Sequence, residues 1–190
     1  MCPPAIPPTT DDELSDEARE LLAKASIDGR DLNIFRTLAH HPKLFKRWLV
    51  FATHILSKSS LSPRDREILI LRTGWLCRSE YEWGQHVLIA KREGLTDREL
   101  RQIAEGPGSE GLAQHDDLLL RAVDELHARS RLSDETWQEL AAIFDRHQLM
   151  DLVFTVGQYS MLAMALSSFG VELDSGVPTF LESVGGEPVL

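Results

Sequence analysis

The chain has 190 residues, of which 43% are hydrophobic and 26% charged, and its formal net charge at pH 7 is −10. This length suffices for one substantial core, and no Gly/Ser/Pro-rich break divides it, so we expect a single domain. Nucleic acids and anionic membrane surfaces are bound by clustered Lys and Arg side chains. The 20 basic residues here are scattered, so we predict no nucleic-acid partner and no membrane partner.

The N-terminal residues carry neither the basic nor the apolar segment of a secretory signal. Two cysteines, Cys2 and Cys77, are too few for a disulfide framework and fit a reducing compartment. We therefore predict a cytoplasmic protein.

Helix signals recur along the chain, starting near its N-terminus. Residues 1–12 include four prolines, which predict an extended arm. Thr10 with Glu13 is a capping-box pattern that predicts a helix through about Ala23. Ser62 with Pro63 is an equally clear helix start. Apolar residues at helical spacing predict the further helices, which we place at about 32–41, 42–56, 63–75, 79–93, 97–105, 116–129, 134–145 and 149–169.

No useful run alternates apolar and polar residues with a period of two, so strands are not expected. We predict an all-α fold of about eight helices in one domain, residues 13–175. Residues 176–190 are expected to form a C-terminal tail.

The last predicted helix, residues 149–169, is apolar on nearly every face. Such a helix is expected to be buried on all sides, in the core or at a subunit interface. Asp151, Gln158 and three serines disfavour a transmembrane span. Gly157 followed by Gln158 and Tyr159 would let a neighbouring helix or a ligand approach closely.

A stretch in the middle of the chain holds the candidate active site. Glu82 and His86 are four residues apart and so share one helical face, with Glu67 upstream. A carboxylate beside an imidazole can transfer protons, and apolar surroundings would shift the pKa values of both. Without further support, such a pair is more often a solvated surface pair. The aromatic residues that predict an apolar setting are Trp75, Tyr81 and Trp83.

The spacing of these residues resembles a known superfamily. Ser79 follows Glu67 by twelve positions, Glu82 follows Ser79 by three, and His86 follows Glu82 by four. This is similar to the signature of the carboxymuconolactone decarboxylase and alkylhydroperoxidase D superfamily, over about residues 30–170. The resemblance implies an alkylhydroperoxidase D-like helical bundle, with Glu67 and His86 at the family glutamate and histidine. The flanking sequences Arg-Glu-x-Leu-Ile-Leu-Arg and Glu-Tyr-Glu-Trp-x-x-His are similar to the decarboxylase branch.

The peroxidase branch of this superfamily carries a Cys-x-x-Cys pair where this chain has Ser79 and Glu82. Its chemistry needs two thiols one helical turn apart, one to attack and one to close a disulfide. Cys77 lies two positions before Ser79, and its one possible partner is Cys2. Peroxide reduction by Cys77 as a lone redox thiol is therefore an alternative hypothesis.

The resemblance implies a cofactor-free decarboxylase that acts on a small cyclic or aromatic-derived carboxylic acid. His86 would be the general acid or base, with Glu82 or Glu67 setting its tautomer. Arg72 is a candidate for pairing with the substrate carboxylate. The other candidates for substrate contact are Ser79, Trp75 and Tyr81, although such aromatic residues are more often core.

Four further expectations complete the prediction. No histidine has the paired ligand spacing of a metal site, and His127 is a possible contributor to the active site from outside the motif. The superfamily and the apolar last helix imply a homo-oligomer: a dimer, trimer or hexamer. A non-catalytic oligomeric binding protein on the same fold is a third hypothesis, which a sealed His86 with no pocket beside it would favour.

Overall fold

The computed structural model describes residues 4–27 and 29–185. In this part of the chain no strand occurs, and β-type pairing is limited to a bridge between Ile27 and Arg30. The prediction of an all-α fold is confirmed. The helices are α1 (Asp16–Ala25), α2 (Asn33–Leu38), α3 (Pro42–Thr53), the π-helix η1 (His54–Lys58), α4 (Pro63–Leu76), α5 (Glu80–Arg92), α6 (Asp97–Glu105), α7 (Gln114–Arg129), α8 (Asp134–Ala141), α9 (Arg146–Phe169) and α10 (Phe180–Val184).

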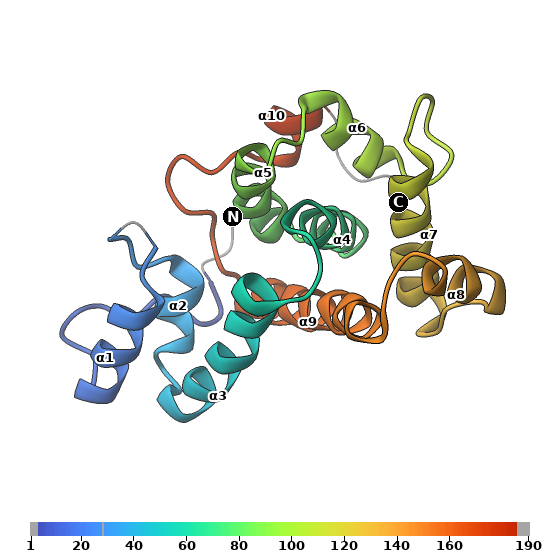
Figure 1. Ribbon diagram of the computed structural model, residues 1–190. Helices are drawn as coiled ribbons and strands as arrows, with labels where there is room; N and C mark the ends of the chain where they lie inside the picture. Colours follow the sequence, from blue (N-terminus) through green and yellow to red (C-terminus); the bar gives the residue numbers. More distant parts are fainter. Residues whose placement is uncertain (1–3, 28, 186–190) are drawn as a thin grey trace.

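Helix α4 lies at the centre of the fold, with α5, α6, α7 and α9 around it (Figure 1). Every residue from 65 to 74 is buried, including two arginines and a glutamate. A helix buried on all faces usually carries only apolar side chains. The polar residues of α4 must therefore be paired inside the protein, and one of these pairs forms the candidate site.

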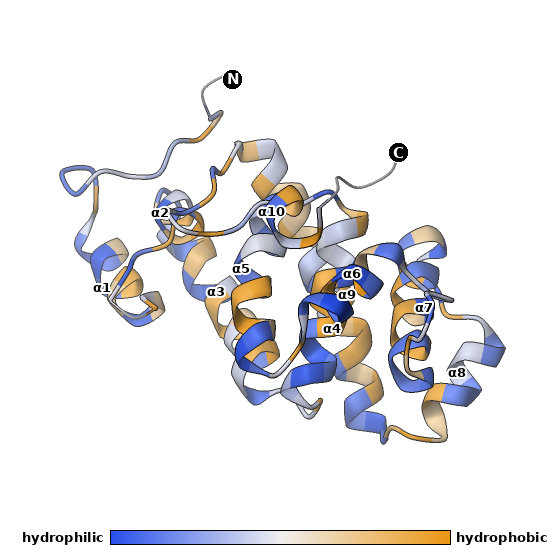
Figure 2. Cartoon of the chain, turned by 90° about the horizontal axis from the view of Figure 1, so that it is seen from above, coloured by the Kyte–Doolittle hydropathy of each residue, from blue (hydrophilic) through white to orange (hydrophobic). Residues whose placement is uncertain are grey.

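The core has two main parts. The larger surrounds α4, and the smaller joins α1, α2 and α3 to Tyr81 of α5 and Leu166 of α9. Figure 1 shows α1–α3 gathered on one side of the α4 bundle. In Figure 2 the helices around α4 carry hydrophobic and hydrophilic stretches side by side, as expected of helices with one buried face. The candidate site lies between these two parts.

Capping residues account for most helix boundaries. The Ser62 hydroxyl accepts a hydrogen bond from the Asp65 amide, and Thr96 forms the predicted capping box with Glu99. The helix predicted from Thr10 was placed too early. Residues 11–13 form a turn, and α1 begins at Asp16 because Ser15 caps it.

The boundary between α8 and α9 also differs from the prediction. Helix α8 ends at Ala141 rather than near Asp145, and α9 begins at Arg146 rather than Leu149. Asp145 forms a capping box with Gln148, and this pairs the first amides of α9. Asp145 thus starts a helix instead of ending one.

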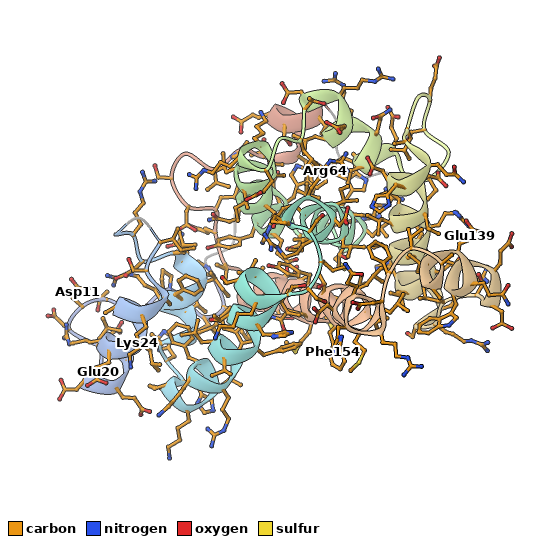
Figure 3. All side chains as sticks on the ribbon, viewed as in Figure 1. Asp11, Glu20, Lys24, Arg64, Glu139 and Phe154 are labelled. Atoms are coloured by element: carbon orange, nitrogen blue, oxygen red, sulfur yellow. The ribbon has the colours of Figure 1, made fainter. Side chains whose placement is uncertain are left out.

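We expected helix α9 to be buried on all sides, in the core or at a subunit interface. Within one chain it is buried on one face only. One face packs against α4, α5, α7 and α8, whereas the opposite face leaves five large apolar side chains exposed. Phe154, 53% exposed, points away from the bundle (Figure 3). By length and composition α9 could cross a membrane, but 44% of its most apolar stretch is buried in the protein. The exposed apolar side chains are Met150, Val153, Phe154, Met161 and Met164.

The segment expected to be a C-terminal tail contains α10, which packs on α5. The Phe180 ring lies 5.7 Å from the Trp83 ring and 5.0 Å from the Trp75 ring. Trp83 Nε1 donates a hydrogen bond to Ser183 Oγ at 2.7 Å. Residues 186–190 of that tail lie outside the described residues.

Gly84 allows this segment to approach α5. A Cβ atom at Gly84 would overlap the Pro178 carbonyl oxygen and the Val177 side chain. A Cβ atom at Gly157 of α9, in contrast, meets no atom within 4 Å.

We predict that Gly84→Ala lowers the free energy of unfolding by about 1 to 3 kcal/mol, the usual cost of overpacking. Gly157→Ala is the matched control and should raise it by roughly 0.5 to 1 kcal/mol, because alanine favours a helix over glycine. Urea denaturation of both variants measures the two changes. Equal effects would contradict the close packing of residues 177–178 on α5.

Candidate active site

The candidate site centres on a buried hydrogen bond between two helices. Glu67 of α4 is completely buried and His86 of α5 is 6% exposed. His86 Nδ1 lies 2.7 Å from Glu67 Oε2, and Arg66 Nε donates to Glu67 Oε1 at 3.2 Å. Because the carboxylate accepts a hydrogen bond from Nδ1, the other ring nitrogen, Nε2, is the one free to exchange a proton with a ligand.

Glu82 is not the partner of His86, although the two share a helical face. Its side chain makes no hydrogen bond within the described residues, and neither does the Ser79 hydroxyl. Of the two glutamates that the sequence left open, the structure therefore pairs Glu67 with the imidazole. The i, i+4 spacing predicts that Glu82 lies near His86 on one helical face, but it does not predict that His86 bonds to Glu67 instead.

Burial changes the protonation of Glu82. The side chain is 2% exposed, and burial raises its pKa to about 8, which the neighbouring Ser79 hydroxyl opposes only in part. At neutral pH Glu82 therefore holds its proton and can donate a hydrogen bond. A carboxylic acid kept neutral in this way can stabilise negative charge on a ligand.

A small pocket opens beside these residues. Its volume is about 90 Å³, and both Glu82 and His86 line it. The edge of the Tyr159 ring meets the His86 ring at 4.9 Å. The remaining walls are mostly apolar and come from α2, α3, η1, α5 and α9, with Ile34, Phe35, Trp48, Ala52, Ile55, Leu56, Ile89 and Leu162 among them.

Sequence reasoning missed most of this pocket. Apart from Ile89, its apolar walls come from residues before 60 and after 155, which no motif connects to His86. Ile55 and Leu56 lie on η1, and single turns of π-helix are frequent at functional sites. The one usable signal was the stretch from Gly157 to Tyr159, two residues of which, Gln158 and Tyr159, line the pocket.

Three of the residues predicted to contact substrate are not available in the pocket: one has its hydroxyl already bonded, and two lie outside the pocket wall. Tyr81 lines the pocket, but its hydroxyl donates to Asp174 and accepts from the Ile34 amide. Ser79 borders a separate, wider depression. Trp75 packs against Trp83, with ring centres 4.9 Å apart, and is not part of the pocket wall.

Arg72 is not brought to the pocket either. Its guanidinium makes two hydrogen bonds to Asp124, at 2.7 and 2.8 Å. It also donates to the carbonyl oxygens of Ile103 and Ala104 at 2.9 and 2.8 Å. These contacts join α4 to α6 and α7, so this arginine connects helices and is not free to bind a carboxylate.

Cys77 lies at the end of α4, outside the pocket wall, and is half-buried. Burial is the main cause that raises the pKa of its thiol; the Glu82 carboxyl raises this pKa further once it has ionised, and Ser160 opposes both effects. His127 Nδ1 is 3.8 Å from the sulfur. Cys2 lies outside the described residues. A raised pKa means less of the nucleophilic thiolate at neutral pH.

Within the described residues, no group of three or more His, Cys, Asp or Glu side chains is placed so that it could hold a metal ion. His127, which we singled out from the sequence, contacts Cys77 rather than the pocket.

Comparisons with known proteins agree with this fold. Residues 42–108 match the carboxymuconolactone decarboxylase family. An uncharacterized peroxidase-related protein from Ralstonia eutropha JMP134, described as an alkylhydroperoxidase AhpD core, has a TM-score of 0.81 at 16% identity, covering 97% of this chain and 98% of that one. A peroxidase-related protein from Silicibacter sp. TM1040 has a TM-score of 0.79 at 14% identity, covering 98% of both chains.

A variant of the debrominase Bmp8, in complex with 2,3,4-tribromopyrrole, is also similar. Its TM-score is 0.73 at 13% identity, and the match covers 90% of this chain and 91% of that one. No curated protein matches. At such low identities these structures show a shared fold.

The Arg72 contacts generate a prediction about stability. Asp124→Ala would leave a buried guanidinium without its carboxylate and should lower the free energy of unfolding by about 2 to 4 kcal/mol. Since the Asp124 side chain is 34% exposed, we place this range slightly below that of a fully buried pair. Chemical denaturation measures the change.

Asp134→Ala is the control, because Asp134 pairs with Arg131 at the surface. This variant should change stability by less than about 1 kcal/mol. Similar losses for the two variants would show that Asp124 does not hold Arg72 in place.

Proposed function

Because residues 42–108 match the carboxymuconolactone decarboxylase family and the fold is alkylhydroperoxidase D-like, we propose that the chain is an acid–base enzyme that decarboxylates a small organic acid. The observation that carries this proposal is the buried Glu67–His86 hydrogen bond at the wall of an apolar pocket. Proton transfer by side chains needs no cofactor.

His86 has the central role in the proposed reaction. The Glu67 carboxylate accepts a hydrogen bond from Nδ1 and stabilises the imidazolium, whose Nε2–H then faces the substrate. Among the described residues that line the pocket there is no Lys or Arg, so a protonated His86 would be the cation that pairs with a substrate carboxylate. A substrate with a single negative charge fits such a site.

The reaction itself breaks one carbon–carbon bond. The carboxylate leaves as carbon dioxide, and the electron pair of the broken bond moves into the unsaturated remainder of the substrate. His86 Nε2 then donates its proton to carbon and is reprotonated from solvent. Glu82, in its neutral form, donates a hydrogen bond to the negative charge that builds up in the transition state.

Two other hypotheses receive less support. Peroxide reduction by Cys77 needs a thiolate, but burial and Glu82 raise the pKa of that thiol. A non-catalytic binding protein does not need a buried acid–base pair at a pocket. The unpaired Glu82 carboxyl in the same pocket favours an enzyme, because functional sites are where such buried groups are tolerated.

The first test is release of carbon dioxide from carboxylated muconolactones and related small unsaturated acids. His86→Ala should lower turnover by roughly two to four orders of magnitude, the range for a lost general acid. Cys77→Ser should leave turnover nearly unchanged.

The control is His147→Ala, which removes a histidine that is 86% exposed. It should behave as the unmodified protein. An active His86→Ala variant together with an inactive Cys77→Ser variant would overturn the proposal in favour of thiol chemistry.

The pH dependence is the next prediction. The titratable groups that interact with the Glu82 carboxyl are Tyr159 of α9 and Cys77 at the end of α4, and His86 of α5 lines the same pocket. Because its pKa is raised to about 8, Glu82 is protonated below that pH and loses its proton above it. Turnover should therefore be sustained at neutral pH and fall by about tenfold per unit well above pH 8.

Glu82→Gln keeps a hydrogen-bond donor that cannot ionise, so this loss of turnover near pH 8 should disappear or move to higher pH. Rate profiles of the unmodified protein and the variant between pH 6 and 10 test this. An unchanged profile in the variant would assign the loss to another group.

A further inference from the structure

Asp151 of α9 is a buried acid to which the proposed reaction assigns no role. It is 9% exposed. Its Oδ2 accepts hydrogen bonds from the Ser60 amide at 2.6 Å, the Ser60 hydroxyl at 2.7 Å and the Ser59 hydroxyl at 3.3 Å. His54 Nε2 lies 3.0 Å from Oδ1. Four contacts from residues 54–60 therefore meet at one carboxyl group.

The Asp151 carboxyl group is ionised at neutral pH. Burial opposes ionisation, but the Ser60 amide and hydroxyl and the His54 imidazole outweigh it and lower the pKa of Asp151 to about 2. An ionised carboxyl group can only accept hydrogen bonds, so His54 Nε2 carries the hydrogen of that contact. Each of the four contacts is thus a hydrogen bond to a charged acceptor, which is the stronger kind.

The donors to Asp151 lie at both ends of the π-helix η1. His54 is the first residue of η1, and Ser59 and Ser60 follow its last residue. Gln148 of α9 adds one hydrogen bond at the second end, to the Ser60 carbonyl oxygen at 3.3 Å. A π-helix closes its hydrogen bonds over one residue more than an α-helix and is rare, so it persists where its surroundings hold it. Asp151 supplies such a hold at each end.

Helix η1 in turn forms part of the pocket wall. Ile55 and Leu56 line the pocket, and Ile55 is completely buried in a cluster with Ile70 of α4 and Tyr159 of α9. The Tyr159 ring meets the His86 ring edge-on, with ring centres 4.9 Å apart. The position of η1 therefore affects both the apolar wall and the packing of the ring next to His86.

We propose that Asp151 is a positioning residue of the pocket: by fastening both ends of η1 to α9, it holds Ile55 and Leu56 in the wall and so limits the size of the ligand. The two elements that Asp151 joins both line the pocket, since α9 contributes Tyr159 and Leu162. The inference concerns the shape of the pocket, and it rests on the proposed function only for its effect on turnover.

Loss of the Asp151 carboxylate would free η1 to adopt α-helical geometry. Because an α-helix has 3.6 residues per turn, removing the extra residue of a π turn rotates the side chains on one side of it by about 100° relative to the other. Ile55 and Leu56 cannot then both keep their places, and the wall gains space. A small ligand would lose contacts with the wall, whereas a longer ligand would find room.

The experiment measures the binding of toluene and of butylbenzene, which share a ring and differ in length, by titration calorimetry. Asp151→Ala should raise the Kd of toluene roughly fourfold to fifteenfold, the effect of losing contact with one or two methylene-sized groups. The Kd of butylbenzene should stay unchanged or fall. In the decarboxylation reaction KM should rise more than kcat falls, because the Glu67–His86 pair is held by α4 and α5.

His54→Leu is a milder variant, since it removes one of the four donors at a half-exposed side chain and leaves those of Ser60 in place. It should shift the ratio of the two affinities in the same direction by a smaller factor. The matched control is Asp124→Ala, which also removes a carboxylate that joins helices, but outside the pocket wall. It should leave the ratio unchanged, whatever its effect on stability.

Three results would overturn the inference: no toluene binding by the unmodified protein, equal changes of both affinities in Asp151→Ala, or the same shift of their ratio in Asp124→Ala. If Asp151→Ala does not fold, an unchanged ratio in His54→Leu overturns it as well. The decarboxylation proposal fails separately. The expected shift of the ratio without carbon dioxide release from any acid would leave the role of Asp151 standing and refute the reaction. Decarboxylation with an unchanged ratio in Asp151→Ala would do the reverse.

Discussion

The hydrogen bond between Glu67 and His86 is the interaction on which the candidate site depends, and it requires α4 to be buried on every face. A carboxylate with no exposed surface is unfavourable unless charged or polar groups compensate it. Here Arg66 and His86 both contact it. The packing of α5, α7 and α9 around α4 keeps water away from this group and presents the imidazole to the pocket.

Two carboxyl groups on adjacent helices have opposite roles because their partners differ. Glu67 has two cationic or imidazole partners and acts as an acceptor, whereas Glu82 has none and its pKa is raised to about 8. The same contrast between a paired and an unpaired acid is the general means by which enzymes obtain both an acid and a base near neutral pH.

The exposed apolar face of α9 lies opposite its contribution to the pocket. Phe154 and Met161 are on the outer face, whereas Gln158 and Tyr159 face inward. Large exposed apolar surfaces on small soluble proteins often mark contacts with another chain. That a second copy covers this face is still a prediction, since the structure contains one chain.

The sequence by itself determined the helical class and most helix boundaries, and it singled out His86 with two candidate glutamates, because capping, periodicity and motif spacing are local properties. It did not determine which glutamate meets His86, that Arg72 is bound by Asp124, or that α10 packs on Trp83. Nor did it reveal that Gln158 faces Glu82's pocket. These features depend on how helices far apart in the chain approach each other, and only the tertiary structure decided the packing that brings them together.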